Sequence, residues 1–300
     1  MGYIISVTNQ KGGVGKTLTA STLASILTEK GLKVLSIDMD PQSNFSQVAG
    51  GPGPIKRYDM KSLSILDVLK QECSIEEATV QTNVGDLVRA SPNLTKWTGR
   101  SLLSRRDFHD LMERNISPEE MVSFLEDRYN TGWGATEHKT LDWALRNVRH
   151  QYDFIILDTN PSLTLLTLNS LYAADYILIP AFTEESSRKA ILELKDTIDQ
   201  MKAENSDMNA EILGILITKY KKRTILAGTY LQEYKRLASK LGTELFEAKI
   251  RDGLVAAEYA NQREDLVRYA PKNPVTQDYR VFVDEFLEKI KARGNHTRGQ

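Results

Sequence analysis

The sequence contains a single cysteine, Cys73, among 300 residues. One thiol excludes an internal disulfide and offers no pair of ligands for an iron–sulfur cluster. No apolar stretch approaches the roughly 20 residues that a membrane-spanning helix needs, and the N-terminus lacks the charged and apolar regions of a secretory signal. These absences predict a cytoplasmic protein that does not enter a membrane.

An excess of charge of one sign is also missing. The sequence has 39 Lys and Arg against 40 Asp and Glu, which gives a formal net charge of −1. This balance excludes a protein that is basic overall and binds nucleic acid for that reason. Any contact with nucleic acid therefore has to come from a local basic patch.

Apolar runs of strand length alternate with stretches of helical spacing. We expect strands at 3–7, 33–37, 86–91, 152–158, 176–180 and 212–218, and a first helix over 18–30. This alternation predicts an α/β fold, doubly wound around a mainly parallel sheet. We expect a single domain over 1–293 with a largely helical insertion at 94–150, followed by a polar tail at 294–300.

A glycine-rich loop follows the first predicted strand and opens the first predicted helix. Its sequence from Gln10 to Thr17 is QKGGVGKT. Glycines allow such a loop to turn its N–H groups toward phosphate, Lys16 can meet the β- and γ-phosphates, and the Thr17 hydroxyl can ligate Mg²⁺. The alternative is a glycine turn that binds nothing. We predict a P-loop that binds ATP and Mg²⁺ through Lys11, Gly12, Gly13, Val14, Gly15, Lys16, Thr17 and Leu18.

Carboxylates follow two other predicted strands. Asp38 and Asp40 come after the strand at 33–37, and Asp158 ends the strand at 152–158. Ligands of parallel α/β sheets lie at these strand ends, so acidic groups there fit a metal ion or a reacting water. A turn that merely ends a strand is the alternative. We predict Thr17, Asp38 and Asp158 as the metal-binding residues.

The loop departs from the usual P-loop pattern, because Gln10 stands where a glycine is common and Lys11 follows it. Lys11, Gly12, Gly13, Gly15, Lys16 and Thr17 match K-G-G-x-G-K-[ST], and 38–42 reads D-x-D-P-Q. In these motifs the chain resembles the ParA/MinD group of P-loop ATPases, whose loop is known as the deviant Walker A motif. The resemblance covers most of 1–92 and 151–290. Asn160 departs from it, because the family usually has proline there.

The resemblance implies roles for individual residues. Lys11 would reach across an ATP-sandwich homodimer to the partner's nucleotide, Asp40 would position the attacking water, and Asp158 would hold Mg²⁺ through water. Lys11, Lys16 and Asp40 are thus the predicted catalytic residues, and Thr218 is expected near the purine. A proline-containing adenine loop is usual where this chain has 249–252, so the residues that contact the base stay open.

The densest positive stretch lies after the strand at 212–218. Its residues, together with one later arginine, are the predicted DNA contacts: Lys219, Lys221, Lys222, Arg223 and Arg251. Basic side chains near an aromatic can grip the phosphate backbone without reading sequence, although a solvated loop has the same composition. No helix-turn-helix precedes the P-loop, so recognition of a specific operator is not expected.

The resemblance also implies a function. A ParA-type ATPase closes as a dimer on ATP, binds DNA non-specifically on the bacterial nucleoid, and is released when a ParB-like centromere-binding partner stimulates hydrolysis. The cargo would be a plasmid or mobile element. The alternatives are an ATPase that positions a protein cargo, a MinD-like regulator, or a nucleotide-bound scaffold. The polar tail lacks the amphipathic helix that a MinD-like membrane contact needs.

Overall fold

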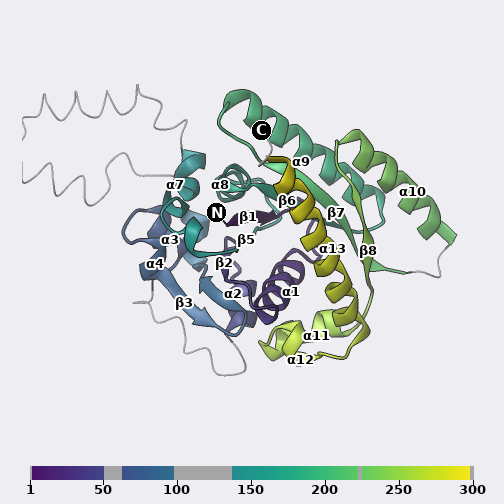
Figure 1. The fold of residues 1–300 in the computed structure, drawn as a ribbon, viewed down its shortest axis with the longest axis horizontal. Helices are drawn as coiled ribbons and strands as arrows, with labels where there is room; N and C mark the ends of the chain where they lie inside the picture. Colours follow the sequence, from purple (N-terminus) through teal and green to yellow (C-terminus); the bar gives the residue numbers. More distant parts are fainter. Residues whose placement is uncertain (1, 51–62, 98–136, 222–224, 298–300) are drawn as a thin grey trace, which may run out of the picture.

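The computed structural model describes residues 2–50, 63–97, 137–221 and 225–297. An eight-stranded sheet runs through the molecule in the order β3-β4-β2-β5-β1-β6-β7-β8 (Figure 1). Its strands are β1 Tyr3–Val7, β2 Val34–Asp38, β3 Thr79–Thr82, β4 Gly85–Val88, β5 Phe154–Asp158, β6 Tyr176–Ala181, β7 Glu211–Tyr220 and β8 Leu245–Arg251. All neighbours pair in parallel except β3 and β4, which form an antiparallel hairpin.

Helices cover both faces of this sheet. The α-helices are α1 Lys16–Glu29, α2 Asn44–Ala49, α3 Ile65–Leu69, α4 Ile75–Ala78, α7 Thr140–Leu145, α8 Leu165–Ala173, α9 Glu185–Glu204, α10 Ile225–Lys240, α11 Val255–Gln262, α12 Leu266–Tyr269 and α13 Pro274–Thr297. Short 3₁₀ helices are η1 Pro92–Lys96, η3 Glu137–Lys139 and η4 Arg149–Gln151. The predicted doubly wound, mainly parallel α/β fold is confirmed.

Successive residues of the central strands point into different cores, which is why these strands read as continuous apolar runs. In β5, Phe154 and Ile156 join the core under α1, α2, α11, α12 and α13. Ile155 and Leu157 join the opposite core, under α3, α7 and α8. A third cluster holds β6 and β7 against α9 and α10. The sheet is therefore buried on both sides.

The predicted insertion at 94–150 is described only at its ends. Leu94 and Trp97 before the gap, and Leu141, Leu145 and Val148 after it, are buried in the same core as β2 and β5. Both ends thus contribute to the core of the sheet. The helices expected between them lie in 98–136, outside the described residues.

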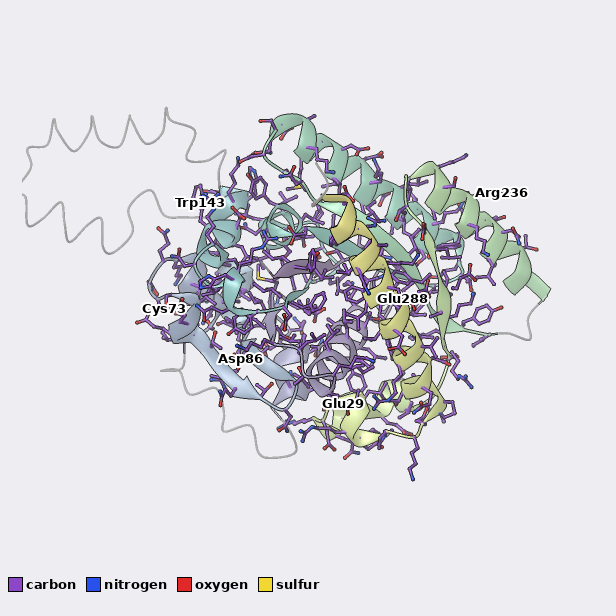
Figure 2. The ribbon with its side chains drawn as sticks, in the orientation of Figure 1. Glu29, Cys73, Asp86, Trp143, Arg236 and Glu288 are labelled. Carbon is purple, nitrogen blue, oxygen red and sulfur yellow. The ribbon has the colours of Figure 1, made fainter. Side chains whose placement is uncertain are left out.

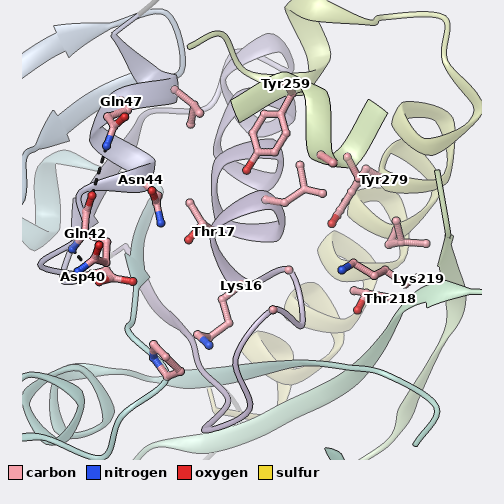
Figure 3. A pocket seen from close by; sticks show the side chains of 18 of the residues that line it. Lys16, Thr17, Asp40, Gln42, Asn44, Gln47, Thr218, Lys219, Tyr259 and Tyr279 are labelled. Carbon is pink, nitrogen blue, oxygen red and sulfur yellow. Dashed lines mark hydrogen bonds between the residues drawn. The ribbon is translucent and has the colours of Figure 1, made fainter. Parts of the chain in front are cut away.

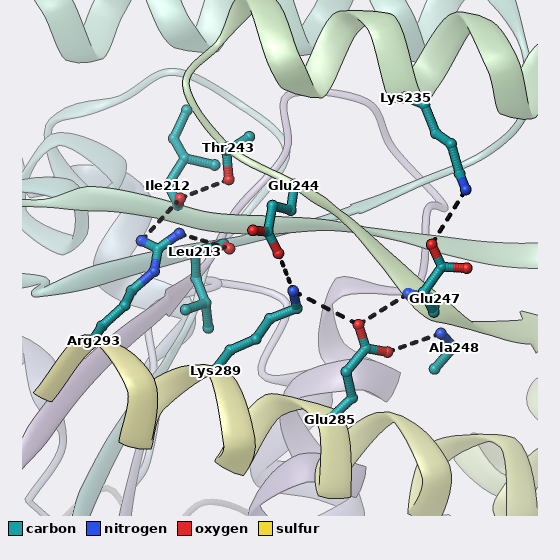
Figure 4. Close-up of polar contacts among 10 residues, drawn as sticks. All are labelled: Ile212, Leu213, Lys235, Thr243, Glu244, Glu247, Ala248, Glu285, Lys289 and Arg293. Atoms are coloured by element: carbon teal, nitrogen blue, oxygen red, sulfur yellow. Dashed lines mark hydrogen bonds and ion pairs between the residues drawn. The ribbon is translucent and has the colours of Figure 1, made fainter. Parts of the chain in front are cut away.

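Two strands were not expected from the sequence. The β3–β4 hairpin occupies 79–88, where only one strand was predicted, and β8 forms an edge of the sheet. Carboxylates of α13 cap the outer backbone N–H groups of β8. Glu285 accepts hydrogen bonds from Glu247 N and Ala248 N, both at 2.9 Å (Figure 4), and Asp278 accepts from Arg251 N at 2.9 Å. The helix α13 therefore follows this edge.

A close approach between β7 and β8 makes Gly214 a sensitive position. A Cβ placed there would lie 2.6 Å from a ring carbon of Phe246. That ring is fully buried and packs edge-to-face on Phe282 at 5.0 Å between centroids, so it has little freedom to yield. We expect Gly214→Ala to lower the free energy of unfolding by about 1–3 kcal/mol, measured by urea denaturation.

Gly228 on α10 is a matched control, because a Cβ placed there meets no atom within 4 Å. Alanine is the better helix former, so Gly228→Ala is expected to stabilise the protein by about 0.5–1 kcal/mol. A Gly214→Ala protein that unfolds at the native urea concentration would contradict the close approach.

Candidate nucleotide-binding site

The strand register brings the predicted acidic residues next to the glycine loop. Asp158 at the end of β5 pairs with Val7 at the end of β1 and with Asp38 at the end of β2. The loop leaves β1 at this same edge, and α1 begins at Lys16. Val7 and Asp158 are far apart in the sequence, yet they converge at the carboxyl edge of the sheet.

The loop has the form of a phosphate cradle. Gly13 and Gly15 have φ values of 75° and 82°, in the left-handed region that favours glycine. A Cβ placed on Gly12, Gly13 or Gly15 would meet no atom within 4 Å, so packing leaves space above the loop. The N-cap Gly15 provides no side-chain cap for α1, a helix of 14 residues. Its first N–H groups can therefore bind an anion.

Lys16 is the buried cation of the loop. Its side chain lies in the cavity wall, is only 7% exposed, and donates a hydrogen bond from Nζ to the backbone oxygen of Lys11 at 3.2 Å. Burial lowers the pKa of Lys16, while the nearby carboxylates of Asp158 and Asp40 oppose this shift. A buried ammonium held among carboxylates at a phosphate cradle fits contact with the β- and γ-phosphates.

Asp158 is the residue that fits a metal ion. It is fully buried, and neither of its side-chain oxygens accepts a hydrogen bond that meets normal geometry within the described residues. Burial raises the pKa of its carboxyl well above the usual range, and Asp38 adds to the rise, while the Thr17 hydroxyl and Lys16 act in the opposite sense. An unpaired buried carboxylate is costly unless a cation faces it. Asp158 and Thr17 thus fit Mg²⁺, which would neutralise phosphate charge.

Asp38 differs from Asp158, because both of its carboxylate oxygens accept hydrogen bonds from the protein. Its Oδ2 accepts hydrogen bonds from Ser46 N at 2.8 Å and Ser46 Oγ at 2.7 Å, and its Oδ1 accepts from Asp40 N at 3.1 Å. Burial raises the pKa of Asp38 to about 6, and the bonds from Ser46 counteract the rise. Because protein donors already occupy both oxygens, the geometry favours a role in positioning Asp40 and α2. The prediction of Asp38 as a metal ligand stays untested.

Asp40 reaches the cavity from the segment after β2. Its Oδ1 accepts a hydrogen bond from Gln42 N at 2.9 Å, and its side chain lines the same cavity as Lys16 and Thr17 (Figure 3). The other oxygen is available to a water or to a nucleotide. Its role beside the attacking water stays a prediction.

The cavity beside the loop has a volume of about 510 Å³. In Figure 3, residues from the segment after β2 lie on one side of Thr17, and residues of β7, α11 and α13 lie on the other: Asp40, Gln42 and Asn44, then Thr218, Tyr259 and Tyr279. Thr218 lies in the wall as predicted for the purine side, although its hydroxyl donates to Val14 O at 2.9 Å. Ile250 and Arg251 also line this wall. They belong to 249–252, for which the sequence did not predict which residues contact the base.

The side chain of Lys11 does not enter the cavity beside the loop. It does not line the cavity, and its Nζ lies 3.7 Å from Glu184 Oε1 in an ion pair whose side chains are 39% and 46% exposed. Exposed pairs of this kind contribute about 0–1 kcal/mol. The lysine can therefore leave Glu184 at low cost.

Sequence reasoning missed Asn9, which fixes the loop to the neighbouring strand. It is fully buried, its amide donates to Pro180 O at 2.7 Å, and its Oδ1 accepts from Lys11 N at 2.9 Å. An amide side chain directly after a buried strand and before the glycine loop was the available signal. Tyr259 and Tyr279 were also missed, because only the fold brings them to the cavity.

The predicted DNA contacts are partly neutralised by acidic neighbours. Lys219 lies in the cavity wall, with Nζ 4.8 Å from the centre of the Phe182 ring. Lys221 forms an ion pair with Asp252 at 3.3 Å, and Arg251 forms two hydrogen bonds with Asp278, each of 2.7 Å. Register places Arg251 opposite Tyr220, between Lys219 and Lys221 in the sequence. Lys222 and Arg223 lie outside the described residues.

The described ranges hold neither a preformed protein cluster for a metal ion nor a membrane-spanning helix. Residues 2–50, 63–97, 137–221 and 225–297 contain no group of three or more His, Cys, Asp or Glu that could hold a metal ion. No helix in the same ranges has the length and apolar character needed to cross a membrane.

The parallel sheet, the cradle at the start of α1, and the unpaired aspartate on the adjacent strand place the chain in the class of P-loop nucleoside triphosphatases. A family model described as AAA domain matches residues 2–212. The chromosome partitioning protein ParA of Myxococcus xanthus is 30% identical, over 99% of this chain and 92% of its own length. The chain belongs to this AAA domain family and is a ParA-type ATPase.

Solved structures agree on the fold. A plasmid partition protein from Borrelia burgdorferi, bound to AMPPNP, has a TM-score of 0.71 at 22% identity and covers 96% of this chain and 100% of its own. A cobyrinic acid a,c-diamide synthase from Mycobacterium smegmatis, with ADP and magnesium, has a TM-score of 0.69 at 24% identity, over 97% and 96% of the two chains. The predictions of an ATPase that uses ATP and Mg²⁺ are confirmed at the level of the family.

Proposed function

We propose that this ATPase closes as a homodimer around ATP, binds DNA without sequence preference, and uses hydrolysis to release it. Its cargo is a plasmid or mobile element, and a ParB-like protein bound at the centromere stimulates hydrolysis. In this proposal the protein works in the bacterial cytoplasm, on the nucleoid. The named ParA relative and the partition protein of the same fold support this reading.

The position of Lys11 supports the proposed dimer. Lys11 belongs to the glycine loop, yet its amine lies outside the loop's own cavity and pairs weakly with Glu184 on the surface. A cation of the motif that lies outside the loop's own cavity supports a contact of Lys11 with a second molecule. A partner chain carrying the same loop would place its nucleotide against this lysine, which is the arrangement of an ATP-sandwich dimer.

We expect Lys11→Ala to bind nucleotide as a monomer with nearly native affinity and to lose the ATP-dependent dimer. The exposed pair with Glu184 contributes little stability, so the variant keeps its fold. Sedimentation velocity with AMPPNP measures the dimer, and a fluorescent nucleotide measures binding. Lys189→Ala is the matched control, because Lys189 forms a comparable exposed pair with Glu193 at 3.7 Å. An intact dimer of the Lys11 variant would refute the reach across the interface.

Retention on DNA tests the rest of the proposal. The protein is passed over immobilised random-sequence duplex with ATP, with ADP and without nucleotide, each at two salt concentrations. We expect retention only with ATP, and a steep loss at the higher salt because phosphate contacts release counterions. Retention that ignores the nucleotide would contradict an ATP-dependent DNA-binding dimer.

A second candidate function is the positioning of a protein cargo by an ATPase whose surface does not hold DNA. The observation that favours it is the pairing of two predicted DNA contacts, Lys221 and Arg251, with Asp252 and Asp278. Absence of retention on DNA in every nucleotide state, together with an intact ATP-dependent dimer, would select this alternative.

A further inference from the structure

Lys219, which the sequence predicts as a DNA contact, lies in the wall of the nucleotide cavity. It lines the same cavity as Lys16 and Thr17, and Figure 3 shows its amine pointing from β7 toward the side on which those two residues lie. The preceding residue, Thr218, is buried and donates from its hydroxyl to Val14 O of the glycine loop at 2.9 Å. The base of the Lys219 side chain is therefore fixed next to the phosphate cradle.

An irregularity in the pairing of β7 with β8 accounts for where this side chain points. Consecutive side chains of a regular strand point to opposite faces, yet Thr218 and Lys219 both line the cavity. The register shifts between Ile217 and Tyr220, and Lys219 has a φ of 49°, in the left-handed region. Bulges beside active sites redirect side chains in this way. The left-handed backbone is strained for lysine, and such strain is typical of ligand-binding sites.

The amine of Lys219 has no acidic partner within the described residues. Its neighbours differ in this respect. Arg251, which also lines the cavity, is held by Asp278 through two hydrogen bonds of 2.7 Å each. Lys221 forms an ion pair with Asp252 at 3.3 Å. Lys219 therefore offers an uncompensated positive charge beside a phosphate cradle, where an anionic ligand gains most from it.

Phe182 supports this amine from a fixed position. The Lys219 Nζ lies 4.8 Å from the centre of the Phe182 ring. The backbone of Phe182 is held by two buried side chains, because its oxygen accepts from the Tyr234 hydroxyl at 2.5 Å and its N–H donates to Ser187 Oγ at 3.1 Å. A ring face attracts an ammonium and leaves N–H donors of the amine for other acceptors. Those donors can bind phosphate oxygens.

From this placement we infer that Lys219 is a nucleotide-binding residue, whose ammonium contacts the phosphate chain of ATP or ADP. The contact adds a second cation to the one that Lys16 provides. Nucleotide binding by a single molecule is enough for it, so neither the proposed dimer nor DNA is needed. A native protein that failed to dimerise or to bind DNA would leave the contact testable.

Isothermal titration with ADP and Mg²⁺ at two salt concentrations tests this contact. Lys219→Met removes the charge and keeps a stem that can lie over Phe182. We expect its affinity for ADP to be about fivefold lower than native at the lower salt, a moderate loss because Lys219 is exposed. The difference narrows at the higher salt, since screening weakens the native contact. A role in the fold alone would give the same ratio at both salts.

Arg236→Met is the matched control, because it removes the same charge away from the cavity. Arg236 is exposed and does not line the cavity, and Figure 2 shows it on the outer side of α10. We expect this variant to bind ADP as the native protein does. Lys219→Arg keeps the charge and is expected to recover most of the affinity. Lys219→Gly carries the test if Lys219→Met does not fold, since glycine adopts the left-handed conformation without strain.

Native ADP affinity in the folded, uncharged Lys219 variant would overturn the inference. Lys219 would then count as a DNA contact if the same variant also lost its ATP-dependent retention on random-sequence duplex. An equal loss of affinity in Arg236→Met, a loss that salt leaves unchanged, or a Lys219→Arg protein as weak as Lys219→Met would overturn it as well. Each of these results would exclude the local charge as the cause.

Discussion

Lys16→Ala is expected to abolish nucleotide binding, with an affinity for ATP lower by about a hundredfold or more. The ammonium is the buried cation of the phosphate cradle, and burial has already removed the water that could replace it. Hydrogen bonds from such a charged donor contribute about 1.5–3 kcal/mol each, and 1.4 kcal/mol corresponds to a factor of ten in affinity. Isothermal titration with ATP and Mg²⁺ measures the loss.

The matched control is Lys30, at the C-terminal end of α1. Lys30 follows α1 and forms an exposed ion pair with Asp284 at 2.8 Å, far from the loop along the chain. We expect Lys30→Ala to bind ATP as the native protein does. Normal ATP affinity of a folded Lys16→Ala protein would remove the glycine loop from nucleotide binding.

Asp40→Ala is expected to keep the ATP-dependent dimer and to reduce ATP turnover about a hundredfold or more, the usual cost of losing a group that directs a proton or a water. Asp40 lines the cavity with one oxygen bonded to Gln42 N and with the other available. Its removal changes the reaction more than the binding, because Lys16 and the loop still hold the phosphates. Phosphate release gives the turnover, and sedimentation gives the dimer.

Asp40→Asn separates chemistry from local structure. The amide keeps an oxygen for the Gln42 N–H at the 2.9 Å position but carries no negative charge. We expect both variants to lose turnover if the carboxylate acts on water. Full turnover in the asparagine variant would reduce Asp40 to a turn residue, and full turnover in the alanine variant would exclude it from the reaction.

Most predictions from the sequence rested on short motifs of neighbouring residues. The glycine loop, the first helix and the apolar strands are encoded by neighbouring residues, so they could be read without knowing the fold. Asp158 was identified for the same reason, since it ends an apolar strand. The register that pairs it with Val7 and Asp38 follows from the parallel order of β1, β5 and β2.

Contacts that depend on the packing of whole elements could not be predicted from the sequence. β8 has the sequence LFEAKIR, in which charged residues alternate with apolar ones at the sheet edge, and the prediction treated part of it as a loop. The bonds of Asp38 to Ser46, of Asn9 to Pro180, and of Tyr234 to Phe182 join residues 8, 171 and 52 positions apart. Such contacts depend on how whole elements pack, and no local pattern in the chain specifies them.

The capping of β8 by α13 has a consequence for how molecules of this chain meet. An open sheet edge is a template on which another chain can add a strand, and that route leads to aggregation. Glu285 and Asp278 already occupy N–H groups of β8, while β3 at the opposite edge is only four residues long. Both edges of the sheet thus discourage strand addition, so molecules of this chain can meet through other surfaces without the edge-to-edge pairing that leads to aggregation.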